Sequence, residues 1–126
     1  MKTVLIVDDE RDAVDVLSLM LEMSGFAVMV AYDGTQAIAC LEQRRPDLIL
    51  SDFMMPGMDG VALCRRLKGD RATADIPFIL MTAAVNVPTD APIDRMITKP
   101  VELAKLLDTF TAVSRQTNHS PVRVVR

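Results

Sequence analysis

Short apolar runs rich in β-branched residues alternate along this sequence with longer segments in which apolar residues recur every three or four positions. The runs are typical of strands, and the longer segments are typical of amphipathic helices. The predicted strands cover residues 3–7, 26–31, 47–51, 76–82 and 95–98, and the predicted helices cover residues 11–24, 34–45, 60–69 and 101–113. Strands that alternate with helices indicate a parallel sheet with helices on both faces. The predicted fold class is therefore α/β, a doubly wound, five-stranded parallel sheet.

One connection is too short for this pattern. Between Thr82, which ends the fourth predicted strand, and Lys99, which follows the fifth, lie 16 residues (83–98). A strand of about 5 residues, a helix of about 11 and two loops of about 2–6 need more than that. The part before the fifth strand also contains Pro88 and Pro92 and has no helical period. We expect the fourth helix of a regular alternation to be missing or reduced to a turn.

Length and composition favour one folded domain. The chain has 126 residues, 50% of them hydrophobic, which is enough to bury a core. We assign residues 1–115 to this domain and expect residues 116–126 to form a flexible tail. The net charge of −3 and the pI of about 5.0 argue against nucleic acid or an anionic membrane as a partner. No apolar run approaches the ~18 residues of a membrane span, and no signal-peptide pattern opens the chain, so we expect a cytoplasmic location.

Cysteine and histidine offer little chemistry in this chain. Cys40 and Cys64 have no second pair of cysteines and no histidine near them in the sequence. We predict that both are free packing residues on helices, with a disulfide or a metal site as the alternative. The single histidine, His119, lies in the predicted tail.

The residues that follow the predicted strands form an unusual set. Asp8 and Asp9 follow the first strand, Asp52 the third, Thr82 ends the fourth, and Lys99 follows the fifth. Because the carboxyl ends of parallel strands meet at one edge of the sheet, these side chains should lie close together. Three carboxylates would repel one another unless a cation offsets them. Mg²⁺, which prefers carboxylate oxygens and water, and the Lys99 ammonium are the two candidates.

Such a set suits phosphoryl transfer, which needs mainly positioning and charge neutralisation. Asp52 is a candidate covalent acceptor, since aspartate carboxylates form phosphoenzyme intermediates. Thr82 offers a hydroxyl donor and Lys99 a mobile charge for phosphoryl oxygens. The alternative is that these are ordinary polar turn residues at strand ends.

Five strings of the sequence together form a specific pattern: VLIVDDE at 4–10, PDLILSD at 46–52, MMPGMDG at 54–60, PFILMTA at 77–83 and TKP at 98–100. With these strings the sequence resembles the receiver domains of two-component response regulators, of which the chemotaxis regulator is the single-domain example. The resemblance covers roughly residues 3–113. It implies a flavodoxin-like fold with strand order 2-1-3-4-5.

The resemblance also implies a metal site. Asp52 would be the phosphoacceptor and a metal ligand, and Asp9 would touch Mg²⁺ directly. Asp8 would bind the ion through water, and the backbone carbonyl of Met54 would supply a further ligand.

The same resemblance assigns the remaining site residues. Thr82 and Lys99 would hold the phosphoryl group, and the Lys99–Pro100 bond is expected to be cis. The phosphoryl group would come from a phosphohistidine on a sensor histidine kinase or a histidine phosphotransfer protein.

Three features depart from the family pattern, and all concern the readout of phosphorylation. The missing helix usually belongs to the output face. Met96 stands where the family often has a switching Tyr or Phe, and Val101 stands where Phe is common. We expect residues 84–94 to form an irregular loop that orders on phosphorylation, with Val85, Val87 and Ile93 as an exposed docking patch.

We therefore predict a stand-alone receiver that switches binding to a downstream partner of unknown identity, with a homodimer possible. It would not be an enzyme, apart from catalysing its own phosphorylation and dephosphorylation. The alternative is a docking or dimerisation module that works without phosphate. A haloacid-dehalogenase-type phosphatase would need an Asp-x-Asp pattern, whereas Asp8 and Asp9 are adjacent. A flavin mononucleotide carrier and a nucleotide hydrolase would each need a phosphate-binding loop that is absent from the sequence.

Overall fold

A computed structural model describes residues 2–84 and 86–115 of the chain. The predicted tail, residues 116–126, lies outside the described residues, and the proposed domain boundary at residue 115 therefore stays a prediction.

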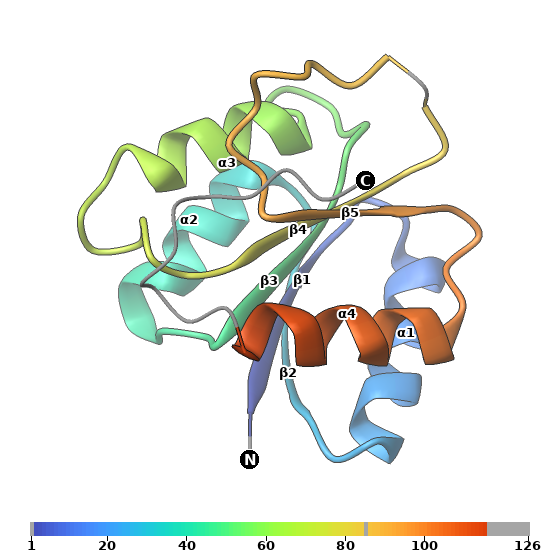
Figure 1. Cartoon of the computed structure of the whole chain (residues 1–126). Coiled ribbons are helices and arrows are strands. Elements are labelled where there is room, and N and C mark those ends of the chain that lie inside the picture. Colours follow the sequence, from blue (N-terminus) through green and yellow to red (C-terminus); the bar gives the residue numbers. More distant parts are fainter. Residues whose placement is uncertain (1, 85, 116–126) are drawn as a thin grey trace.

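Five parallel strands form one sheet in the order β2-β1-β3-β4-β5 (Figure 1). The strands are β1 (Thr3–Val7), β2 (Ala27–Ala31), β3 (Leu48–Asp52), β4 (Phe78–Thr82) and β5 (Arg95–Thr98). The helices are α1 (Arg11–Met23), α2 (Gly34–Gln43), α3 (Gly60–Lys68) and α4 (Leu103–Arg115). The predicted flavodoxin-like architecture and its strand order are confirmed.

The sheet separates two apolar layers. One layer contains buried residues of α2 and α3, and the other contains buried residues of α1 and α4, so each face of the sheet carries a pair of helices (Figure 1). The side chains of β1 alternate between them: Leu5 and Val7 face the α2/α3 layer, and Val4 and Ile6 face the α1/α4 layer. All four are fully buried, which explains why this strand is a continuous apolar run rather than an alternating one.

The predicted elements are shifted by a few residues at their ends. The second helix ends at Gln43, and its cap Arg44 already has an extended backbone. The last helix begins later than predicted, and its first turn starts from Glu102, whose carbonyl accepts the Leu106 N–H at 3.0 Å. Asp52 belongs to β3 itself, since it pairs with Met81 of β4.

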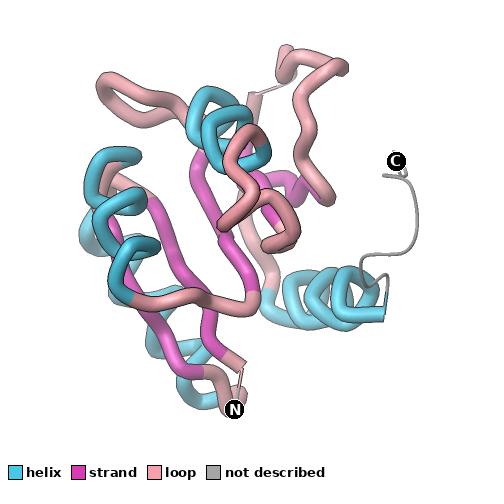
Figure 2. Tube along the Cα trace, turned by 90° about the vertical axis from the view of Figure 1, so that its left-hand side faces the viewer, coloured by secondary structure: helices cyan, strands magenta, loops and turns pink. Residues whose placement is uncertain are grey.

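No helix lies between β4 and β5 in the described residues, as the sequence predicted. Residues 86–94, here called the strap, follow an irregular path instead and appear as loop throughout (Figure 2). Val87, Ala91 and Ile93 of the strap pack against the α2/α3 layer.

The expected docking patch is therefore wrong for Val87 and Ile93, and Val85 lies outside the described residues. The physical reason is that the sheet face left bare by the missing helix must still be covered. The strap's apolar side chains turn inward to cover it.

The cysteines have the packing role that the sequence predicted. Cys40 on α2 and Cys64 on α3 are both free thiols. Burial raises the pKa of Cys64 to about 12, so this thiol stays protonated and unreactive at neutral pH. None of the helices in the described part of the chain has the length and hydropathy that crossing a bilayer requires.

Candidate functional site

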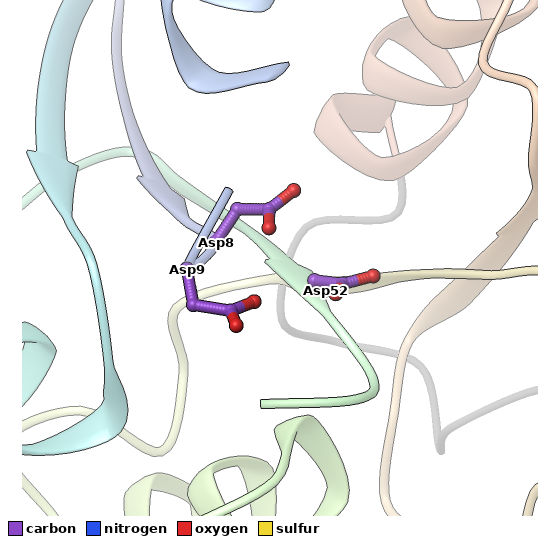
Figure 3. Close-up of side chains that lie close together, drawn as sticks. All are labelled: Asp8, Asp9 and Asp52. Atoms are coloured by element: carbon purple, nitrogen blue, oxygen red, sulfur yellow. The ribbon is translucent and has the colours of Figure 1, made fainter. Parts of the chain in front are cut away.

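Three carboxylates meet at the carboxyl ends of β1 and β3 (Figure 3). Oxygen atoms of Asp8, Asp9 and Asp52 all lie within 4.8 Å of one another. The parallel register, with Val7 of β1 beside Ser51 of β3, brings them together because Asp8 and Asp9 follow β1 and Asp52 ends β3 at the same edge of the sheet. Asp8 and Asp52 are buried, with 3% and 6% of their surface exposed, whereas Asp9 is exposed.

Asp8 is held by the backbone on both sides. Its N–H donates to the Ala31 carbonyl of β2 at 3.1 Å, and its Oδ1 accepts the Glu10 N–H at 3.0 Å. Burial raises the pKa of Asp8, the Glu10 hydrogen bond opposes this, and the negative charge of Asp52 adds to the rise. The charged form of the Asp8 carboxylate is therefore disfavoured at this site, and a nearby cation would favour it.

Lys99 supplies one cation directly. Its Nζ lies 2.6 Å from Oδ1 of Asp52. Burial acts to lower the pKa of Lys99, but the hydrogen bond and the charge of Asp52 outweigh it, so that the pKa is raised. The ammonium therefore stays charged beside the candidate acceptor. The Lys99–Pro100 bond is cis, as the resemblance implied.

Thr82 ends β4 at the same edge of the sheet and is 3% exposed. Its Oγ1 accepts the Ala84 N–H at 2.8 Å. Because the hydroxyl acts as the acceptor in that bond, its own proton remains available for another oxygen. The Thr82 carbonyl accepts the Lys99 N–H at 3.0 Å, which joins the two predicted phosphoryl-binding residues through the backbone.

Gly60 is a residue of the site that sequence reasoning did not single out. It begins α3, where the Asp59 side chain caps the helix by accepting the Ala62 N–H at 2.8 Å. Its own N–H donates to the Phe53 carbonyl at 2.8 Å, and a Cβ at this position would overlap the Asp52 carbonyl oxygen. The first residue of α3 therefore packs closely against the backbone of Asp52, the candidate acceptor. The Asp-Gly pair at the head of a predicted helix was the available signal.

The donor atoms fit Mg²⁺ better than a transition metal. The cluster offers carboxylate oxygens from three residues, with no sulfur or imidazole ligand among them. The Met54 side chain is 67% exposed, and any role of this residue as a ligand would come from its backbone carbonyl. The assignment of Asp8, Asp9, Asp52 and Met54 as metal ligands stays a prediction.

The family model described as "Response regulator receiver domain" matches residues 4–111. The chain belongs to this family.

Similar proteins include response regulators from several bacteria. The chain is 37% identical to the "DNA-binding dual master transcriptional regulator RpaA" of Synechocystis, over 96% of this chain and 52% of that protein. It is 39% identical to the "Phosphate regulon transcriptional regulatory protein PhoB" of Pseudomonas aeruginosa, over 98% of this chain and 58% of that protein. The chain thus spans about half the length of these curated relatives.

Solved structures of receiver domains share the fold over nearly the whole chain. The receiver domain of a histidine kinase from Syntrophus aciditrophicus superimposes with a TM-score of 0.86 at 32% identity, covering 99% of this chain and 98% of that one. The chemotaxis protein CheY4 of Vibrio cholerae gives a TM-score of 0.83 at 28% identity, covering 90% and 98%. A third similar structure is the receiver domain of a Pseudomonas aeruginosa sensor histidine kinase, with a magnesium ion coordinated in its active-site cleft. It superimposes with a TM-score of 0.82 at 26% identity, covering 90% of this chain and 98% of that one.

Proposed function

We propose that this receiver domain accepts a phosphoryl group on Asp52 in a Mg²⁺-dependent reaction and thereby switches its binding to a partner. The observation that carries the proposal is the grouping of three carboxylates with the Lys99 ammonium, which lies 2.6 Å from Asp52. A nucleophile and a cation share one buried corner there, and both are needed for transfer of a negatively charged group.

In the proposed reaction, a carboxylate oxygen of Asp52 attacks the phosphorus of a phosphohistidine. An O–P bond forms, the P–N bond breaks, and the electron pair leaves with the donor's imidazole. Mg²⁺ bound at the acid cluster would offset the charge on the phosphoryl oxygens. Lys99 would move from the Asp52 carboxylate to a phosphoryl oxygen, and Thr82 would donate its free hydroxyl proton to another.

Receiver domains are phosphoacceptor signalling domains rather than conventional enzymes. The proposed donor is a sensor histidine kinase or a histidine phosphotransfer protein, and the proposed location is the cytoplasm. The two relatives above carry transcriptional regulation in their names, and the chain matches about half of each. A protein partner rather than nucleic acid is consistent with the net charge of −3.

A second candidate is a receiver-like module that docks or dimerises without phosphate. The strap favours it, because the described residues lack the helix that usually belongs to the output face. The discriminating property is whether partner or self-association depends on the state of Asp52.

The proposal is tested by titrating the protein with beryllofluoride, a phosphoryl mimic, in the presence of Mg²⁺. Amide chemical shifts should change around Asp52, Thr82 and Lys99 in the wild type and not in Asp52→Asn. A pull-down with and without the mimic then separates the two candidates. Capture that is identical in both states would favour the phosphate-independent module.

A further inference from the structure

The connection between β4 and β5 is the one crossover of the sheet whose described residues hold no helix. In the other crossovers, a helix packed on the sheet fixes where the next strand begins. Here the strap must do this, and its last residue, Asp94, directly precedes β5. β5 is an edge strand of four residues that pairs only with β4. It therefore has few ladder hydrogen bonds of its own to set its register.

Asp94 makes three contacts that fix the start of β5 against the start of β4. Its N–H donates to the Phe78 carbonyl at 2.9 Å, and its Oδ2 accepts the Phe78 N–H at 2.7 Å. Its Oδ2 also lies 2.8 Å from Nζ of Lys68, the last residue of α3. Asp94 thus engages both backbone groups of the first residue of β4 and is tied to a helix at the same time.

Lys68 is itself held in place. Its Nζ donates to the carbonyls of Ala74 and Ile76, at 3.1 and 2.9 Å, as well as to Asp94. All three donor positions of the ammonium are therefore used. Only 18% of the Lys68 side chain and 25% of the Asp94 side chain are exposed, so the pair is less screened than a surface ion pair.

The pairing register of β5 with β4, which begins directly after Asp94, determines the position of Lys99. From Arg95 opposite Ile79, the pairing runs to Thr98 opposite Thr82. The next residue is Lys99, whose Nζ reaches Asp52 at 2.6 Å. A slip of one residue would move Lys99 by about 3.3 Å and turn each β5 side chain to the opposite face.

We propose that Asp94, together with Lys68, is a positioning pair that sets the register of β5 and so delivers Lys99 to the phosphoryl group. The pair touches neither Asp52 nor the metal ligands, and it acts only through the placement of Lys99. This inference rests on the proposed function of Asp52 as phosphoacceptor.

The chain contains a matched control. Asp90 of the strap pairs with Arg65 of α3 at 3.1 Å, so the same strap and the same helix carry a second Asp–basic pair. The Arg65 and Asp90 side chains are 46% and 78% exposed, and exposed ion pairs contribute little. Asp90→Ala removes an ion pair of the same type without touching the start of β5.

The experiment measures two affinities by NMR titration for the wild type, Asp94→Ala, Lys68→Met and Asp90→Ala. The first is the affinity for beryllofluoride at saturating Mg²⁺, which depends on Lys99. The second is the affinity for Mg²⁺ alone, which depends on acids carried by β1 and β3. Asp94→Ala and Lys68→Met should bind beryllofluoride about tenfold or more weakly, because a misplacement of about 1 Å at a reacting group can cost a hundredfold. Their Mg²⁺ affinity should stay within about twofold of wild type, and Asp90→Ala should match wild type in both titrations.

Two results would overturn the inference. One is a beryllofluoride affinity of Asp94→Ala equal to that of Asp90→Ala. The other is an equal loss of Mg²⁺ and beryllofluoride binding, which would mean a general loss of structure.

If Asp94→Ala does not fold, Asp94→Asn takes its place. Its amide oxygen still accepts the Phe78 N–H, and it loses only the charge that faces Lys68. It should show a smaller loss confined to beryllofluoride, and wild-type behaviour would again overturn the inference. A wild type that binds no beryllofluoride would instead contradict the proposed function.

Discussion

The two sides of the candidate site are built in different ways. On the β1–β3 side, three acids project from central strands that are buried on both faces and joined to their neighbours through helices. On the β4–β5 side, Lys99 follows a four-residue edge strand, and the strap stands where a helix would be. The first side can hold its geometry through the core. On the second side only Ile97 of β5 is buried, and we propose that the polar contacts of Asp94 set its geometry.

The difference indicates that the proposed chemistry and its proposed readout would have separate structural supports in this chain. The acid cluster has the arrangement that the strand ends predicted, with Asp8, Asp9 and Asp52 in reach of one another. The region that would report phosphorylation has a strap, and Met96 is 52% exposed where the family often has an aromatic residue. Variants of the two sides should therefore have separable effects.

The largest separable effect is expected for Lys99→Ala. Phosphorylation by a small donor should persist, because the three acids remain. The conformational response should be largely lost, because no lysine ammonium binds the phosphoryl group. Amide chemical shifts at a beryllofluoride concentration that saturates each protein measure this response. Lys105→Ala, which removes an exposed lysine of α4, serves as the control. Wild-type shift changes in Lys99→Ala would show that Lys99 is not the coupling group.

Mg²⁺ affinity should distinguish the two acids that follow β1. Asp9→Ala should weaken binding by roughly tenfold or more, because Asp9 is exposed and free to touch the ion. Asp8→Ala should weaken it less, since Asp8 is buried and its Oδ1 already accepts the Glu10 N–H. Isothermal titration of both variants, with Asp12→Ala as a control for net charge, measures the difference. Equal losses would contradict this division of roles.

The pH dependence of stability should reveal the strain at Asp8 when Mg²⁺ is chelated. The pKa of Asp8 is raised above 3.8 in the fold, so the folded state takes up a proton before the unfolded state does. As pH falls from neutral through the raised pKa towards 3.8, the wild type should gain stability relative to Asp8→Asn. Urea unfolding of both proteins across this range gives the difference. A difference that is flat or moves the other way would mean that the carboxylate is not strained.

The smallest effect is expected for the lifetime of the aspartyl phosphate. Met54 lies two residues after Asp52, its side chain is 67% exposed, and it cannot orient a water molecule by hydrogen bonding. Met54→Asn should shorten the lifetime a few-fold by helping to aim a water at phosphorus. Met23→Asn is the matched control, because Met23 is 80% exposed on α1. An unchanged or longer lifetime in Met54→Asn would refute the idea.

The sequence predicted the sheet and the meeting of the acids because both follow from simple rules. Apolar runs such as residues 3–7 define buried strands, and parallel strands place Asp8 and Asp52 at one edge. The absence of a helix before β5 followed from a residue count.

The partners of individual side chains were not predictable in this way. The apolar residues of the strap follow no periodic pattern, so the sequence did not predict that Val87 and Ile93 pack against the core. Asp94 looked like any loop acid until its contacts with Phe78 and Lys68 were known. Gly60 was missed because its role is a backbone contact with Asp52, which a sequence pattern does not record.

The most direct test of the account is intact-mass spectrometry after incubation with acetyl phosphate and Mg²⁺. The wild type should gain the mass of one phosphoryl group, and the gain should disappear when Mg²⁺ is chelated. Asp52→Asn should gain none, since it lacks the attacking carboxylate. A phosphorylated Asp52→Asn protein, or a wild type that never gains the group, would contradict the assignment of Asp52 as the phosphoacceptor.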